Sequence, residues 1–110
     1  MEGLISGKKK RTYEEFRTTL PSSVAVLFDD LRSYCFTLGK NVVEDIRMHR
    51  IVFSKSMTFR NFADIEPQRD SIILKIKRDR KEPEKEMQIK LNDSLDEIKK
   101  LLLDAYTNIR

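Results

Sequence analysis

Two segments of the chain repeat apolar residues every three or four positions, which is the period of an α-helix. The first segment runs from about residue 22 to Gly39, and Ser22 or Ser23 is its expected amino-terminal cap. Gly39 stands where a helix commonly ends on a left-handed residue. The apolar stripe of this helix consists of Val24, Leu27, Phe28, Leu31, Cys35 and Leu38.

The second periodic segment predicts a helix that starts at residues 92–94, where Ser94 and Glu97 have the spacing of a capping box. Its stripe consists of Leu95, Ile98, Leu102, Ala105 and Ile109. A shorter helix is expected near the other end of the chain, because Thr12 and Glu15 have the same capping-box spacing.

Between these helices the period changes from that of a helix to that of a strand, in which every second residue is apolar. The expected strands cover residues 42–48, 51–53, 59–65, 72–77 and 87–91. Pro67 ends the third strand, because proline cannot donate to a sheet ladder. The connections between strands are short, which favours an antiparallel meander over parallel pairing.

The order helix, helix, five strands, helix predicts an α+β fold. We expect a two-layer sandwich, in which helices pack on one face of a mainly antiparallel sheet of about five strands. At 110 residues the chain has the size of one domain, and residues 12–110 are expected to form it. Residues 1–11 contain Lys8, Lys9, Lys10 and Arg11 and are expected to be a disordered basic arm.

The composition excludes several classes of protein. No stretch approaches the roughly 20 apolar residues of a membrane span, so we expect no membrane partner and a cytoplasmic location. Cys35 is the only cysteine, which excludes an internal disulfide and a cysteine-based zinc site. The three glycines are scattered and supply no phosphate-binding loop, and no residue pattern indicates a metal or another cofactor.

Few residues are candidates for catalysis. His49 is the only histidine, and we favour a surface polar residue over a ligand or general base. Glu44 and Asp64 would form a carboxylate pair for a metal or for acid–base chemistry if their strands brought them together. The favoured alternative is that each carboxylate pairs with an arginine such as Arg60 or Arg47. We therefore predict that the chain is not an enzyme.

The chain carries 22 lysines and arginines against 18 acidic residues, and the positive charge offers a stronger indication than the carboxylates. Alternation places Lys75, Lys77 and Lys90 on the sheet face away from the helices, and it places Arg60 on the same strand face as Phe62. A basic sheet face with an exposed ring is typical of surfaces that bind phosphate backbones and stack bases.

The basic arm, Lys8 to Arg11, would add nonspecific phosphate contacts to such a surface. A solubility tail, or a remnant of expression design, is the alternative interpretation of the same residues.

The chain also resembles a known family between Val24 and Tyr106. The matching residues are Leu27-Phe28, Leu31-Arg32, Leu38-Gly39, Val43-Glu44, Ile51-Val52-Phe53, Asn61-Phe62-Ala63-Asp64-Ile65, Pro67-Gln68, Leu101-Leu102 and Ala105-Tyr106. The family is a small uncharacterised prokaryotic domain, sometimes labelled a predicted transport protein, which occurs alone or appended to larger proteins, some of them restriction-endonuclease-like. One departure is the charged segment Asp79 to Glu86, where family members tend to carry glycine and histidine.

Three functions follow as hypotheses. The leading one is a noncatalytic binding module that contacts DNA or RNA weakly through the basic sheet face and the arm. The second is a protein-interaction or small-ligand module that uses the sheet face around Phe53 and Phe62, with another protein or a second copy as partner. The third is an enzyme built on Glu44 and Asp64.

Overall fold

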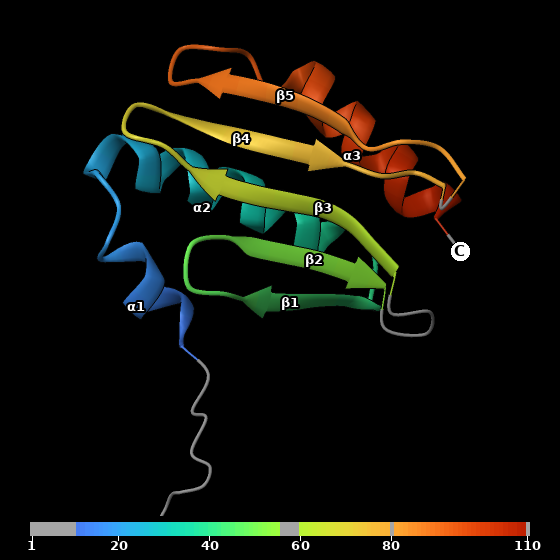
Figure 1. Cartoon of the computed structure of the whole chain (residues 1–110), viewed down its shortest axis with the longest axis horizontal. Helices are drawn as coiled ribbons and strands as arrows, with labels where there is room; N and C mark the ends of the chain where they lie inside the picture. Colours follow the sequence, from blue (N-terminus) through green and yellow to red (C-terminus); the bar gives the residue numbers. More distant parts are fainter. Residues whose placement is uncertain (1–10, 56–59, 80, 110) are drawn as a thin grey trace, which may run out of the picture.

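A computed structural model describes residues 11–55, 60–79 and 81–109, and these residues form three helices and a single five-stranded sheet (Figure 1). The elements in chain order are α1 (Tyr13–Arg17), α2 (Ser22–Thr37), β1 (Val42–Ile46), β2 (Ile51–Lys55), β3 (Arg60–Pro67), β4 (Ser71–Ile76), β5 (Lys85–Lys90) and α3 (Asp96–Asn108). The predictions made for Lys8, Lys9, Lys10 and Phe59 lie outside the described residues.

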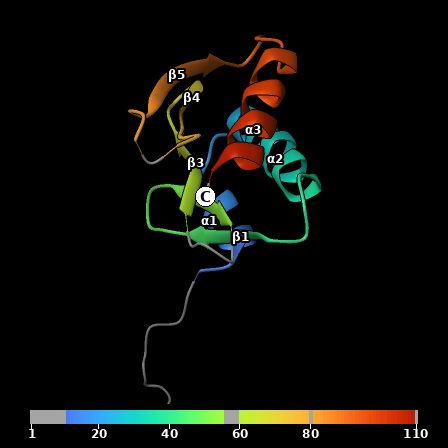
Figure 2. The same cartoon turned by 90° about the vertical axis from the view of Figure 1, so that its right-hand side faces the viewer.

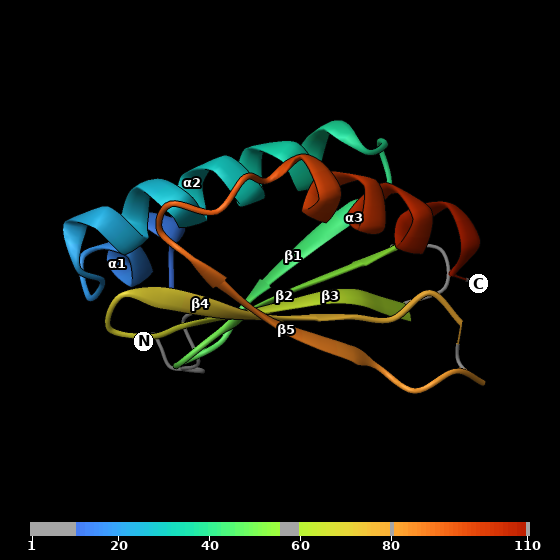
Figure 3. The ribbon, with the colours of Figure 1, turned by 90° about the horizontal axis from the view of Figure 1, so that it is seen from above.

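The strands form an antiparallel meander in the order β1-β2-β3-β4-β5. Helices α2 and α3 lie side by side on one face of this sheet, as the end view in Figure 2 shows. In the view from above, the other face carries no described helix, and the strands fan out because sheets twist (Figure 3). The predicted α+β two-layer sandwich is therefore confirmed.

The core forms where the apolar strand face meets the helices. Cross-strand partners share a face. Ile65 of β3 lies opposite Ile51 of β2 on one side and opposite Leu74 of β4 on the other, and all three side chains are buried. Phe28 of α2 and Leu102 of α3 are buried over this face. Each such side chain contributes about 1.5–3 kcal/mol through its removal from water.

Helix starts agree with the predictions only in part. Thr12 forms the predicted capping box with Glu15, since each side chain accepts a hydrogen bond from the backbone amide of the other residue. The predicted serine cap of α2 is wrong, because Pro21 occupies the cap position without a side-chain bond and Ser22 is already helical. The predicted box at Ser94 is also wrong, since α3 starts at Asp96 and the Ser94 hydroxyl accepts from the amide of Asp96 itself.

Gly39 corrects another prediction. Its φ lies outside the left-handed region, and Leu38 caps α2 in a right-handed conformation. A β-carbon added at Gly39 would approach the ring of Tyr106, with Cζ at 2.8 Å. Glycine is therefore required here by the close approach of α3 and not by the backbone angle.

Candidate functional site

The carboxylates considered for catalysis lie on opposite faces of the sheet. Glu44 is in register with Phe53, on the face that the helices cover. Its carboxylate accepts hydrogen bonds from Arg32 of α2, at 2.6 Å from Nε and 3.1 Å from Nη2, and is only 12% exposed. Asp64 is in register with Val52 on the other face, so the hypothesis of an enzyme built on Glu44 and Asp64 is wrong.

Each of these carboxylates instead belongs to an ion pair. Arg50 contacts Asp64 and Glu66 of β3, at 3.1 Å in both cases. The prediction that each carboxylate pairs with an arginine is therefore confirmed. The arginines are Arg32 and Arg50, and not the predicted Arg47 or Arg60. Proximity in the sequence does not predict these partners, because Arg32 comes from α2 and Arg50 from the turn before β2.

The face without helices carries charges of both signs. Lys75 lies there as predicted, in register with Asp64 on one side and with Glu86 on the other. Lys90 is in register with Ser71, at the opposite end of β5 from Lys85. Lys77 follows the last residue of β4 and is half-buried. Asp64 and Glu86 therefore flank Lys75, and Lys90 lies at the other end of the β4–β5 pair, so these lysines do not form the continuous basic surface that the sequence predicts.

The prediction of an exposed ring at Phe62 is wrong. Ala63 is in register with Phe53, and Asn61 with Ser54, so Phe62 is the extra residue of a β-bulge. The bulge turns Phe62 toward α3, where its ring packs edge-on against Tyr106 with centroids 5.4 Å apart, and the side chain is fully buried.

The proposed ligand surface around Phe53 and Phe62 also fails, because Phe53 is fully buried as well and contacts Phe36 of α2. No ring of this pair remains on the helix-free face for a base or a ligand to stack on.

Arg60 and Arg11 lie apart from the lysines. Arg60 is in register with Lys55, whose ammonium donates to the Ile109 carbonyl at 3.2 Å and lies 4.6 Å from the centre of the Tyr106 ring. Because cross-strand partners share a face, Arg60 is on the helix-covered side. Arg11 donates to the Met48 carbonyl at 2.9 Å, at the opposite end of the molecule.

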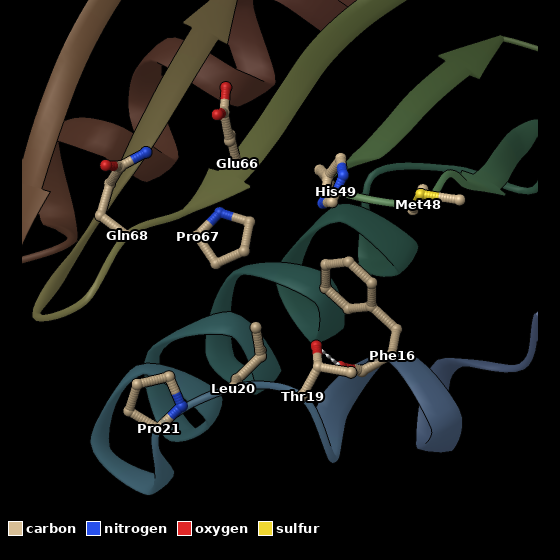
Figure 4. Close-up of a pocket in the computed structure, with 9 residues that line it drawn as sticks. All are labelled: Phe16, Thr19, Leu20, Pro21, Met48, His49, Glu66, Pro67 and Gln68. Carbon is tan, nitrogen blue, oxygen red and sulfur yellow. Dashed lines mark hydrogen bonds between the residues drawn. The ribbon is translucent and has the colours of Figure 1, made fainter.

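A cleft is found where three segments that are distant in sequence meet (Figure 4). The connection between α1 and α2 forms one wall, and the β1–β2 and β3–β4 turns form the other. Its volume is about 370 Å³. The lining residues are Phe16, Thr19, Leu20, Pro21, Met48, His49, Glu66, Pro67 and Gln68.

The cleft combines apolar walls with a polar rim. Phe16, Leu20 and Pro67 supply the apolar contacts, and Figure 4 shows His49 and Glu66 on the side of the sheet turns. Glu66 is held in place by its ion pair with Arg50. In Figure 4 the side chains of Glu66 and Gln68 extend away from Phe16 and Leu20, so His49 is the polar side chain nearest the apolar wall. An imidazole next to an apolar surface can bind a small polar group and its apolar body together.

The exposed position of His49 confirms that it is a surface polar residue. The sequence did not indicate its place in the cleft, although Pro67 was expected to end a strand; Pro21 stands in the connection between α1 and α2. Those prolines mark two of the three chain reversals that meet here. Nothing in the sequence indicates that the reversals are neighbours in space.

Among the described residues, no group of three or more histidine, cysteine or acidic side chains has the arrangement of a metal site. None of the described helices is long and apolar enough to cross a membrane. Compared with known proteins, the chain matches no family, no curated protein and no solved structure.

Proposed function

We propose that this chain is a small binding module whose ligand site is the cleft between the α1–α2 connection and the two sheet turns. The observation that carries the proposal is an apolar hollow lined by three segments that are far apart in the sequence, with His49 beside Phe16 and Leu20. A volume of about 370 Å³ falls among those of small-molecule sites. The fitting ligand is a small molecule with an apolar body and one polar end.

A larger hollow between α2 and the segment after β5 fits this role less well. Its volume is about 550 Å³, but it has no aromatic wall, and its charged groups, Asp30 and Asp93, are both carboxylates. It offers a ligand no histidine and no cation. A ligand with an uncharged polar end therefore favours the cleft.

The experiment is a fragment screen by saturation-transfer NMR on the wild type and two variants. Met48→Lys places a long charged side chain at the lip of the cleft, and Val26→Lys makes the same change in the other hollow. Both residues are largely exposed, at 70% and 56%, so both variants are expected to fold. Fragments that bind the wild type should bind Met48→Lys at least about tenfold more weakly and Val26→Lys unchanged.

Equal binding to the wild type and Met48→Lys contradicts the proposal. So does the absence of binding by aromatic carboxylates, amines and neutral fragments at about millimolar concentration, where weak small-molecule sites are detected.

As a second candidate function we propose weak contact with nucleic acid, on the basis of the position of Arg11. Its hydrogen bond to the Met48 carbonyl attaches the residue that directly follows Lys8, Lys9 and Lys10 to the lip of the cleft. Lys75 and Lys90 on the helix-free face would add scattered phosphate contacts. Because no ring is exposed among the described residues of the helix-free face, such binding would be electrostatic and independent of base sequence.

Fluorescence anisotropy with short single-stranded DNA and RNA tests this candidate. We expect weak binding at about 20 mM salt that falls steeply as salt rises. Replacing lysines 8–10 with alanine should weaken it more than replacing Lys75, Lys77 and Lys90 with alanine, because Lys75 lies between two carboxylates and Lys90 is at the other end of the β4–β5 pair. No binding at about 20 mM salt removes the candidate.

The resemblance to the small prokaryotic domain and the cytoplasmic location both stay predictions. Cys35 is fully buried, and burial raises the pKa of its thiol to about 12. Such a thiol stays protonated and inert at neutral pH.

A further inference from the structure

Each wall of the larger hollow, between α2 and the segment after β5, contributes an apolar side chain and a carboxylate. Figure 3 shows that this segment runs beside α2 on its way to α3. On α2, Val26 and Asp30 are about one turn apart and share a face of the helix. On the other wall, Leu91 and Asp93 follow the last residue of β5. Two carboxylates therefore lie beside one apolar surface.

The apolar surface of the larger hollow is open to solvent. Val26 is 56% exposed and Leu91 is 37% exposed, whereas Leu27, which also lines the hollow, is buried. Small-molecule sites bury most of their ligand, and a hollow with such exposed walls does not. Exposed apolar side chains that gather at one place are typical of an interaction surface for a larger partner.

Neither wall of the larger hollow is a strand. One wall is the helix α2, whose backbone is bonded internally. The other wall begins with a turn, in which the Asp93 amide donates to the Lys90 carbonyl at 3.0 Å and the Asp93 carboxylate accepts from the Lys90 amide at 2.8 Å. An extended segment therefore finds no strand to pair with here. A partner that satisfies its own backbone groups, as a helix does, fits these walls better.

The charge of the larger hollow is opposite to that of the whole chain. The chain carries a net charge of +4, but the charged residues that line the hollow are Asp30 and Asp93. Asp30 has no hydrogen-bond or ion-pair partner among the described residues. The cations nearest in the sequence are directed elsewhere, since Arg32 binds Glu44 and Lys90 lies on the helix-free face. The first turn of α3 is acidic as well. The hollow therefore favours a cationic partner.

We propose that the larger hollow docks a basic amphipathic helix of a partner protein. An aliphatic side chain of that helix packs between Val26 and Leu91, and lysine or arginine side chains beside it face Asp30 and Asp93. An amphipathic helix that lays its apolar face into a groove is a common mode of recognition. Nucleic acid does not fit, because its phosphates would meet the two carboxylates. The proposal does not rest on the cleft, whose lining residues are all different.

A synthetic helix of about 15 residues, with leucine along one face and lysine elsewhere, serves as the probe. Fluorescence anisotropy measures its binding to the wild type and to variants at exposed positions. Val26→Lys should weaken binding at least about tenfold, since it places a like charge in the apolar contact. Asp30→Asn keeps the shape of the side chain and should weaken binding about threefold, as the loss of an exposed ion pair does.

Met48→Lys is the matched control, because it adds the same charge at the cleft and should leave binding of the probe unchanged. A second probe, with glutamate in place of lysine, should bind at least about tenfold more weakly than the first. Equal weakening by Val26→Lys and Met48→Lys overturns the proposal, because it would leave only the net charge as the cause.

The proposal is also overturned if the glutamate probe binds as tightly as the lysine probe, or if the lysine probe does not bind at about millimolar concentration. A wild-type dimer in sedimentation that Val26→Lys separates would assign the hollow to a second copy of the chain, and it would overturn the proposal as well.

Discussion

At the scale of the residue, Gly39 and Tyr106 form the contact that joins the end of α2 to α3. The Tyr106 ring is fixed on its other sides by Phe62 and by the ammonium of Lys55. A methyl group at Gly39 would meet this ring, so Gly39→Ala should destabilise the fold by about 1–3 kcal/mol, as overpacking does.

Urea unfolding of four proteins measures this coupling: the wild type, Gly39→Ala, Tyr106→Phe and the double variant. Tyr106→Phe removes the hydroxyl, which is the atom nearest the added methyl, but leaves Cζ in place. The double variant should therefore recover part of the lost free energy of unfolding. An unchanged Gly39→Ala variant would show that the ring does not lie on the glycine.

A second contact at this scale depends on pH. Asp29 of α2 accepts hydrogen bonds from the Arg17 guanidinium and, at 2.6 Å, from the Tyr13 hydroxyl. The bonds from Arg17 hold the pKa of the Asp29 carboxyl below its ordinary value, against the opposing effect of burial. Its stabilising contribution is therefore complete above the ordinary aspartate pKa and is lost as the pH falls through the lowered one.

Asp29→Asn should accordingly be less stable than the wild type at pH 7, and the difference should shrink below about pH 4. We expect a small effect, about 0–1 kcal/mol, because both side chains are partly exposed. Thermal melts across this pH range measure it. A difference that is the same at pH 7 and at pH 2.5 (about one to two units below the ordinary pKa) would assign the effect to shape rather than to charge.

At the scale of the element, the bulge in β3 decides which side chains reach the core. Phe62→Ala should cost about 3–5 kcal/mol, since the ring is fully buried. Phe36→Ala is the matched control and should cost much less, because Phe36 is half-exposed on α2. Guanidinium unfolding compares the two. Equal costs would contradict the inward orientation of Phe62 and restore it as a surface ring.

The elements show why part of the fold could be predicted from the sequence. The period of α2 and the alternation around Ile72 and Leu74 follow directly from which side chains must be buried, so the helices, strands and layers could be predicted. The bulge at Phe62 could not, because one extra residue shifts the alternation without changing the composition of the strand. The starts of α2 and α3 were predicted wrongly for another reason, since neighbouring residues, such as Ser22 and Ser23, or Asn92 and Ser94, fit a cap equally well.

At the scale of the whole molecule, the distribution of surface charge and the formation of the cleft depend on contacts between segments that are distant in the sequence. The excess of lysine and arginine can be counted in the sequence, but their positions relative to acidic residues cannot. Lys75 lies opposite Asp64 and Glu86 only because of the strand register. The cleft likewise needs Phe16, His49 and Gln68 to become neighbours. These residues are far apart along the chain, and no local period relates them.

The most direct test of the account is a map of amide chemical shifts in the ¹⁵N-labelled chain, titrated with the strongest fragment from the screen. We predict that the shifts concentrate at the residues other than proline that line the cleft, which are Phe16, Thr19, Leu20, Met48, His49, Glu66 and Gln68. Shifts that concentrate instead around Lys75, Lys77 and Lys90, on the helix-free face, would contradict the assignment of the binding site.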